Sequence, residues 1–304
     1  MTKRSVDILI CTFRRPDVTR TLASVAACTP PPDTRLRIVV VDNDDTPSAR
    51  EVVETAAAGH PFPVSYVHAP RRNISIARNA CLDAADADWI ALLDDDEYVE
   101  PGWLVALLET AERAQVDGVF GPVLADYPPG TPGWIRARDY HSSRPQRRRG
   151  RVETGLTGNA LLRWRNTPWQ AERFDIARGR SGGEDTEFFF RLGRAGARFE
   201  ICDAAIVREA VPENRLSFDW LRRRRFRMGQ SYVSSAPTLS SRLALGGKAM
   251  AKTLLCGGMA LACVAHRERR NYWSLRGAMH AGVCAGCIAL PEAEHYGAAS
   301  EPSR

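Results

Sequence analysis

The sequence lacks the glycine-rich phosphate loops that mark the commonest nucleotide-binding proteins. No GxGxxG follows the first predicted strand, which excludes the dinucleotide-binding proteins, and no GxxxxGK[ST] occurs, which excludes the P-loop nucleotide hydrolases. A long apolar run is also missing. Residues 253–264 form an uncharged stretch of 12 residues, whereas a membrane-spanning helix needs about 20. Because neither phosphate loop is present, any bound phosphate must be neutralised by other groups.

Paired cysteine motifs are missing as well. The eight cysteines are scattered, and several lie in apolar runs, as Cys11 and Cys263 do. Cys284 and Cys287 form a CxxC, but no second pair completes a zinc site, so we interpret this spacing as chance. Residues 1–4 lead directly into a strand pattern, so we expect no secretory signal. Together these features predict a cytoplasmic protein with reduced thiols.

Positive charge is in excess and unevenly placed. The chain has 42 Lys and Arg against 36 Asp and Glu, a net charge of +6. Seven arginines lie within residues 136–151 and five within residues 222–227. Such clusters are typical of sites for phosphate-bearing ligands or of anionic membrane contacts, and a solvated face is the open alternative. No nucleic-acid-binding module accompanies them, so we expect no nucleic-acid partner.

Short apolar strands alternate with amphipathic helices in the first 115 residues. This alternation predicts an α/β protein with a doubly wound, mostly parallel sheet flanked by helices. The predicted strands are 6–11, 36–41, 64–68 and 89–93, and the predicted helices begin near Val18 and span 48–58, 74–87 and 103–115.

Polar side chains follow three of the predicted strands, at residues 12–15, 42–45 and 94–97. Ligands of such sheets bind beyond the carboxyl ends of the strands. Asp and Asn also form caps and turns, but three adjacent carboxylates at one strand end favour a bound cation. Oxygen ligands of this kind suit Mg²⁺ or Mn²⁺.

The second half of the chain holds a further acidic motif. Proline, glycine and arginine predict a long loop after residue 120, and residues 157–162 predict a strand entered through a tight turn. Gly182 and Gly183 then precede Glu184 and Asp185 at the start of a predicted helix. These carboxylates either cap the helix or serve as a general base, and the residues alone leave both interpretations open.

Taken together, residues 5–230 resemble a family 2 glycosyltransferase of the GT-A fold. The likeness is to bacterial enzymes that add sugars to lipid-linked exopolysaccharide or surface-glycan intermediates. Residues 8–16 resemble the first strand and turn of the family, which contact the nucleotide base, and this implies that Cys11, Thr12 and Arg14 bind the donor. Asp42 and Asn43 resemble the second strand end, where a carboxylate reads the base and ribose.

The resemblance also implies the donor-phosphate and metal residues. Arg78 stands in an Ala-Arg-Asn stretch similar to one that helps to bind the nucleotide. Residues 92–97 resemble the DxD motif, which implies that Asp94 or Asp95 binds the ribose and that Asp96 binds Mg²⁺ or Mn²⁺. No histidine matches a third metal ligand.

The late acidic motif completes the resemblance. Gly183-Glu184-Asp185 is similar to the family's Glu-Asp motif, which implies that Asp185 is the base of an inverting transfer and that Glu184 adjoins the substrate. Residues 211–215 and 225–229 resemble trailing signatures of the subfamily. The QxxRW of processive enzymes is absent, which favours a single addition per acceptor.

From this resemblance we expect a nucleotide-sugar-binding half at 1–120, an acceptor and catalytic-base half at 121–230, and a C-terminal helical segment at 231–304. The expected partners are a nucleotide-diphosphate sugar donor and a lipid-linked glycan acceptor. Two other functions would also use clustered charges: a metal-dependent phosphodiesterase or nuclease, and a non-enzymatic anion-binding module.

The C-terminal segment mixes apolar and basic residues. Lys248, Lys252 and the arginines at 267, 269 and 270 flank the uncharged stretch at 253–264. The pattern predicts either an interfacial amphipathic helix at the inner face of the cell membrane or a helical cap on the core or on another subunit.

Overall fold

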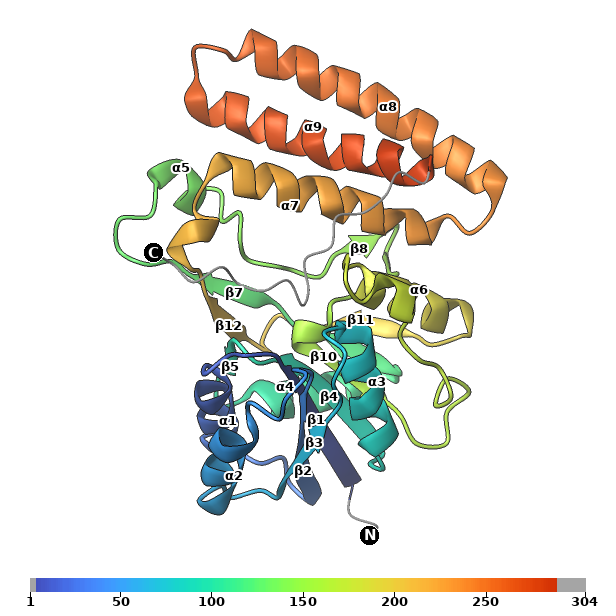
Figure 1. The fold of residues 1–304 in the computed structure, drawn as a ribbon. Coiled ribbons are helices and arrows are strands. Elements are labelled where there is room, and N and C mark those ends of the chain that lie inside the picture. The colour runs from blue at the N-terminus through green and yellow to red at the C-terminus, as the bar shows by residue number, and fades with distance from the viewer. Residues whose placement is uncertain (1–3, 289–304) are drawn as a thin grey trace.

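A seven-stranded sheet forms the centre of the structure, a computed structural model that describes residues 4–288 (Figure 1). Its strands are β1 Arg4–Thr12, β2 Thr34–Asp42, β3 Val64–His68, β4 Trp89–Asp94, β6 Gly118–Phe120, β10 Ala160–Arg163 and β11 Phe199–Ile201. They lie in the order β11-β6-β10-β4-β1-β2-β3. β10 runs antiparallel to both neighbours, and every other pair is parallel. The predicted α/β class is confirmed.

Helices cover both faces of this sheet. The helices of one face are α1 Val18–Ala26, α2 Arg50–Ala58 and α4 Trp103–Ala114, and those of the other are α3 Ile74–Ala84 and α6 Glu184–Arg194. Alternate residues of a strand point to opposite faces, so Ile8 and Ile10 pack under α1 and α4 while Leu9 packs under α3. This double burial explains the near-continuous apolar runs of the strands.

Two predicted helices differ from the structure at their ends. The helix predicted to start at residue 48 starts at Arg50, and the one predicted to reach residue 87 ends at Ala84. Ala85 has an extended backbone with φ −79° and ψ 130°, so it leaves the helix and leads toward β4. The strand predicted at 157–162 is a 3-10 turn, η1 Thr157–Asn159, followed by β10.

The region after residue 120 contains short elements rather than one long loop. A small second sheet has the order β5-β12-β7, and β8 pairs with β9 in a hairpin. The bounds are β5 Glu97–Val99, β7 Val123–Asp126, α5 Gly133–Arg136, β8 Arg147–Arg148, β9 Arg151–Val152, η2 Ile176–Arg178, β12 Val207–Ala210, η3 Glu213–Arg215 and η4 Tyr232–Ser235. Because β10 and β11 belong to the main sheet, the predicted halves at residue 120 share one sheet.

Three helices are stacked over the carboxyl edge of the sheet (Figure 1). They are α7 Phe218–Ser231, α8 Leu239–Ala262 and α9 Arg267–Cys287, and α9 lies between the other two. A Cβ atom on Gly282 would overlap the carbonyl oxygen of Phe226 in α7, so these helices touch backbone to backbone. The predicted C-terminal helices are present up to Cys287; residues 1–3 and 289–304 lie outside the described residues. Within the described part of the chain, no helix is both long and apolar enough to cross a membrane.

Candidate active site

The carboxyl ends of β1, β2 and β4 meet at the edge of the sheet that faces α7 (Figure 1). Parallel strands deliver their last residues to one edge, which is why the polar segments after these strands converge. The turn after β1 contacts the acidic cluster after β4. Thr12 Oγ1 donates a hydrogen bond of 2.8 Å to Asp95 Oδ2.

Arg15 binds two of the three aspartates that follow one another at the end of β4. Its Nη1 lies 3.1 Å from Asp95 Oδ1 and also pairs with Asp96. The Asp95 side chain is only 7% exposed, and this burial raises its pKa to about 7. Arg15 was not among the predicted site residues, although it stands in the predicted turn beside Arg14. Its ion pairs could be seen only once β1 and β4 were adjacent.

Arg78 connects the end of β4 to the start of α6. Its Nη2 lies 3.4 Å from Asp94 Oδ1, and its Nη1 pairs with Glu184. Burial alone would lower the pKa of Arg78, and the charges of Glu184 and Asp94 reverse this, so its pKa lies above the ordinary value. Both terminal nitrogens therefore face carboxylates of the protein. The predicted DxD and Glu-Asp motifs are brought together by this guanidinium.

Asp185 lies at the beginning of α6, next to this ion pair. Gly182 and Gly183 have φ angles of +95° and +81°, which glycine adopts without strain. They turn the chain so that α6 starts at Glu184. Burial, together with the charge of Glu184, raises the pKa of Asp185 to about 7 against the opposing charge of Arg78. A carboxylate with a pKa near neutrality is suited to accept a proton.

Asp42 is fully buried at the end of β2. Its Oδ1 accepts a hydrogen bond of 3.0 Å from the Asp44 amide, and its Oδ2 accepts bonds of 2.8 Å from the Ala49 amide and the Tyr66 hydroxyl. The carboxylate predicted to read the nucleoside thus shapes the loop between β2 and α2.

Asn43 is also fully buried and connects neighbouring loops. Its side chain donates a bond of 2.5 Å to the Ala69 carbonyl and accepts one of 2.6 Å from the Asn73 amide. The rim of the site is formed by more accessible residues. The Nε of Arg14, whose side chain is 43% exposed, lies 2.9 Å from an oxygen of Asp44.

Cys11, the remaining predicted donor residue, lies at the end of β1 and is half-buried. Its Sγ is 3.6 Å from the Sγ of Cys81 in α3. Both thiols are free, as are Cys284 and Cys287 of the CxxC.

A buried carboxyl group, that of Glu97, supports the acidic segment 94–96. Glu97 is buried, and its Oε2 accepts a hydrogen bond of 2.9 Å from the Asp94 amide. Burial and the charge of Asp94 raise the pKa of Glu97 well above its ordinary value. A Cβ atom on Gly158 would overlap this carboxyl group, so only glycine leaves room for it. Glu97 fixes the direction in which the Asp94 backbone leaves β4.

The residues fit a divalent metal that arrives with a phosphate ligand. Among residues 4–288, no three His, Cys, Asp or Glu side chains converge as a ready metal site. Mg²⁺ bound with nucleotides typically takes one or two carboxylates and completes its shell with phosphate oxygens and water. Asp96, whose side chain is 22% exposed, offers such an oxygen beside the partly exposed Asp94.

Two arginines near β12 add positive charge to this edge, Arg215 of η3 and Arg224 of α7. Arg215 Nη1 lies 2.6 Å from Glu209 Oε1 on β12. Burial and the charge of Asp96 raise the pKa of Glu209, and the charges of Arg215 and Arg224 oppose this. Arg224 belongs to the basic cluster at 222–227 that the sequence indicated. Arg224 therefore brings positive charge from α7 toward the carboxylate edge.

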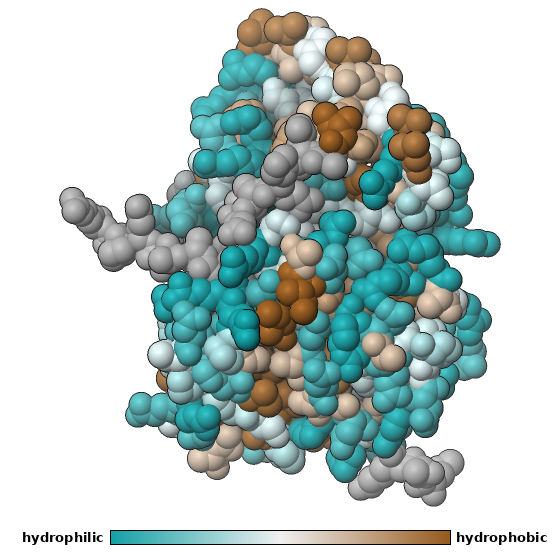
Figure 2. Space-filling model, turned by 45° about the vertical axis from the view of Figure 1, so that its right-hand side comes forward, coloured by the Kyte–Doolittle hydropathy of each residue, from teal (hydrophilic) through white to brown (hydrophobic). Residues whose placement is uncertain are grey.

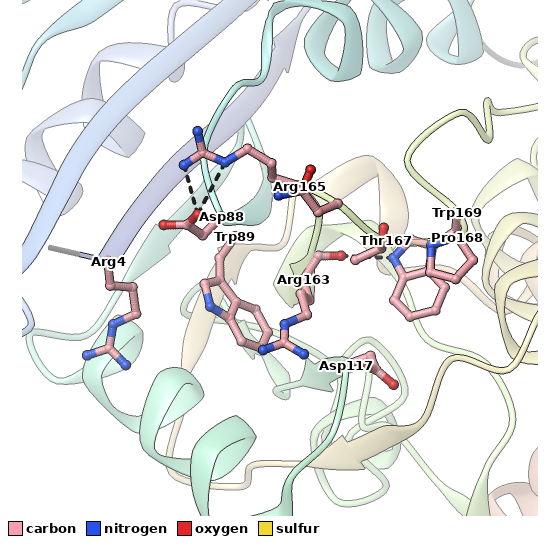
Figure 3. Close-up of a pocket in the computed structure, with 10 residues that line it drawn as sticks. Arg4, Asp88, Trp89, Asp117, Arg163, Arg165, Thr167, Pro168 and Trp169 are labelled. Atoms are coloured by element: carbon pink, nitrogen blue, oxygen red, sulfur yellow. Dashed lines mark hydrogen bonds and ion pairs between the residues drawn. The ribbon is translucent and has the colours of Figure 1, made fainter. Parts of the chain in front are cut away.

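A cavity of about 480 Å³ lies at the opposite edge of the sheet (Figure 3). Arg4 at the start of β1, Trp89 at the start of β4 and Arg163 at the end of the antiparallel β10 line it. Arg165 Nη2 lies 2.8 Å from Asp88 Oδ1 within it (Figure 3). It contains none of the predicted site residues.

Comparison with solved structures places this fold among GT-A glycosyltransferases. A mannosyltransferase from Pyrobaculum calidifontis, solved with GDP-Man and Mn²⁺, aligns with a TM-score of 0.61 at 17% identity over 92% of this chain and 86% of that chain. Residues 1–349 of S. aureus TarS, solved with UDP-GlcNAc, align with a TM-score of 0.55 at 15% identity over 91% and 92%.

Comparison of sequences is more direct. Succinoglycan biosynthesis protein ExoM of Rhizobium meliloti strain 1021 is 46% identical over 299 residues, which cover 96% of each chain. The family model described as glycosyl transferase family 2 matches residues 7–165, and that of glycosyl transferase family group 2 matches residues 89–284. The first match spans the ends of β1, β2 and β4, and the second includes Asp185 and most of the helical stack. The chain belongs to glycosyl transferase family 2.

Proposed function

We propose that this glycosyltransferase moves one sugar from a nucleoside-diphosphate sugar to an acceptor hydroxyl with inversion of the anomeric carbon. The observation that carries the proposal is the bridge made by Arg78, which joins Asp94 to Glu184 beside Asp185. Donor-side carboxylates and a candidate base thus adjoin one another. The donor class is supported by the two structural relatives, which were solved with GDP-Man and with UDP-GlcNAc.

The donor would lie along the carboxyl edge of the sheet. Asp94 and Asp95 are proposed for the ribose, and Thr12 and Arg14 for the nucleoside side of the site. Asp42 and Asn43 act by shaping the loops around the base, because their own polar atoms are engaged within the protein. Arg78 holds the two acidic motifs in register.

Asp96 would hold Mg²⁺ or Mn²⁺ together with the donor diphosphate. When bound, the ion supplies positive charge that stabilises the leaving diphosphate. The chain contributes further positive charge from Arg15 and from the arginines of α7. Arg15 now pairs with Asp96, so we expect it to turn from this carboxylate toward the phosphates when the ion and donor bind.

Asp185 would take the proton from the acceptor hydroxyl as that oxygen attacks the anomeric carbon. Its pKa, raised to about 7 by burial and Glu184, places the change of protonation in the neutral range. Attack from the face opposite the diphosphate breaks the glycosyl–phosphate bond in one displacement and inverts the configuration. General-base catalysis of this kind contributes about 10²–10⁴-fold in rate.

The acceptor is proposed to be a lipid-linked glycan intermediate of exopolysaccharide synthesis. The support is the relative named for succinoglycan biosynthesis, to which the chain is 46% identical over nearly its whole length. Single rather than repeated addition rests on the missing QxxRW.

The test is a panel of nucleoside-diphosphate sugars with Mn²⁺, scored first by thermal shift. The stabilising donor is then incubated with membrane lipid extract, and the anomeric configuration of the new linkage is read by NMR. We expect one donor to be preferred and the configuration to be inverted. A retained configuration would contradict the role of Asp185. If the donor is rapidly hydrolysed and no sugar transfer occurs with any lipid extract, the phosphodiesterase alternative is favoured.

A further inference from the structure

The outermost helix of the stack, α8, has an apolar outer side (Figures 1 and 2). Figure 2 shows hydrophobic side chains gathered at the top of the molecule, over this helix. Six large apolar residues of α8 are between 51% and 77% exposed: Leu239, Leu243, Met250, Leu254, Leu255 and Leu261. Apart from Leu255, which lies further round the exposed surface, their spacing of 4, 7, 4 and 7 residues places them in a stripe on one side of the helix. The stripe runs the length of α8, whose 24 residues span about 36 Å.

The remaining surface of α8 suits an interface that is apolar at its centre and positive at its borders. Ala249 and Cys256 form the buried side, which faces α9. The exposed positions other than the stripe are small or apolar, with four polar exceptions: Ser240, Arg242, Lys248 and Lys252. On a helical wheel Arg242 lies next to the stripe on one flank of the exposed apolar surface, and Lys248 and Lys252 lie next to Leu255 on the other. α8 contains no Asp or Glu.

The positive charge continues into α9. Its exposed cations are Arg267, Arg269, Arg270 and Arg276, and Glu268 is the one carboxylate of the two helices. Seven cations against one carboxylate make the hairpin of α8 and α9 strongly basic. Tyr272 and Trp273, both half-buried, lie in the same helix.

Two occupants are physically possible for an apolar stripe of this size, a lipid bilayer or a second copy of the chain. A second copy would bring two sets of like charges together, and no carboxylate of α8 would compensate them. An anionic bilayer compensates these charges, and each Lys or Arg near such a surface contributes about 1 kcal/mol. A helix with an apolar side and Lys or Arg along its polar border is the type that lies in the membrane interface.

We propose that the outer side of α8 docks on an anionic lipid bilayer, with the leucines in the acyl boundary and the bordering cations on lipid phosphates. Docking does not depend on the sugar transfer proposed above, and it can be measured without donor or acceptor. It would hold the enzyme at the membrane through α8 while α9 and α7 connect it to the carboxylate edge.

The full-length chain should be tested by flotation with phosphatidylcholine vesicles, with and without phosphatidylglycerol. We expect binding to the anionic vesicles and a clear loss in 0.5 M salt, because surface charges are then screened. The triple variant Leu243→Ser/Leu254→Ser/Leu261→Ser should bind at least about tenfold more weakly, since each leucine loses apolar burial. The pair Lys248→Gln/Lys252→Gln should lower binding to anionic vesicles by about tenfold or more.

A matched control replaces exposed apolar residues elsewhere, Val52→Ser and Ile176→Ser, which are 40% and 55% exposed. This variant should float as the unaltered chain does. Circular dichroism and thermal unfolding show whether the triple variant is folded, and exposed substitutions of this kind change stability little. Failure of the unaltered chain to float with anionic vesicles would overturn the proposal. Unchanged flotation of the triple leucine variant would also overturn it. A dimer in analytical sedimentation that the leucine substitutions dissociate would overturn it too, and would assign the stripe to a second copy of the chain.

Discussion

Arg78 is the residue on which the two acidic motifs of the site depend. Its side chain is 8% exposed and its guanidinium contacts Asp94 and Glu184, and the Glu184 side chain is itself 7% exposed. The second carboxylate oxygen of Glu184 is buried without a hydrogen-bond partner. Removal of the guanidinium would leave this buried charge uncompensated, which typically costs 3–5 kcal/mol.

We therefore predict that Arg78→Ala lowers the free energy of unfolding by about 3 kcal/mol, measured by urea denaturation. The double variant Arg78→Met/Glu184→Gln should recover part of the loss, because the buried charge is then removed together with its partner. A loss below about 1 kcal/mol in the single variant would show that the ion pair is solvated in solution and does not hold α6 to β4.

Asp185 allows a prediction about pH. Its pKa is raised to about 7, so below this pH the carboxyl group is protonated and cannot accept the acceptor proton. The transfer rate should rise as pH increases from 5.5 to 8, with its midpoint near 7. Asp185→Asn should lower kcat by about 10²–10⁴-fold and leave donor Kd unchanged.

Asp95 has a pKa in the same range, so donor Kd must be followed over the same pH series. A midpoint in Kd belongs to Asp95, and a midpoint in kcat belongs to Asp185. The matched control is Asp83→Asn at a surface carboxylate that is 64% exposed, and it should alter neither. Near-normal turnover by Asp185→Asn would refute the assignment of the base.

At these positions the sequence predicted the residue types better than their contacts. Carboxylates at a strand end predicted an acidic edge, and the structure places Asp94, Asp95 and Asp96 there. The same reasoning could not separate Asp42, whose oxygens bind the backbone and Tyr66, from a carboxylate that faces a ligand. Nor could it identify Arg15, because its partners Asp95 and Asp96 follow β4, which lies beside β1 only in the folded sheet.

Among the elements, the strands were the most predictable. Burial on both faces forces continuous apolar runs, and these runs marked β1 to β4 to within two residues at each end. Helix ends depend on weaker local terms, so predicted boundaries differed by two or three residues. The packing of α9 on α7 could not be predicted from the local sequence pattern, because it depends on glycines of two separate helices that meet only in the folded chain.

The contact between α7 and α9 can be tested at one of these glycines. A Cβ on Gly282 would overlap the Phe226 carbonyl oxygen, so Gly282→Ala must push the helices apart. We predict a loss of about 1–3 kcal/mol in the free energy of unfolding, with faster proteolysis within α8 and α9. Gly258 is the matched control, since a Cβ there meets no atom within 4 Å.

Gly258→Ala should be neutral or should stabilise by up to about 1 kcal/mol, because alanine favours a helix more than glycine does. Equal behaviour of the two variants would mean that α9 is not packed closely against α7 in solution. Both glycines lie in long C-terminal helices, so both variants gain the same helix propensity. A difference in stability between them therefore reports the contact of Gly282 with α7.

On the scale of the molecule, the candidate site joins segments that are distant along the chain. β1 and β4 contribute Thr12 and Asp95, α6 contributes Asp185, and the arginines of α7 lie near Glu209. A ligand bound across these elements would stabilise all of them against unfolding. The helical stack adds a separate apolar and basic surface at the far side of α7, which gives the molecule two faces of different chemistry.

This arrangement predicts that binding of the donor together with the metal ion raises the free energy of unfolding of the whole chain. A ligand that binds the folded chain at 100 times its Kd stabilises it by about 2.7 kcal/mol, so the preferred donor with Mn²⁺ should raise Tm by several degrees. Asp96→Asn should abolish the part of this shift that depends on Mn²⁺, because its amide no longer offers a charged oxygen ligand. Asp83→Asn should keep the full shift. If chelation leaves the donor-induced shift of the unaltered chain unchanged, the ion is not held between Asp96 and the diphosphate, and Arg15 with the α7 arginines must neutralise the phosphates alone.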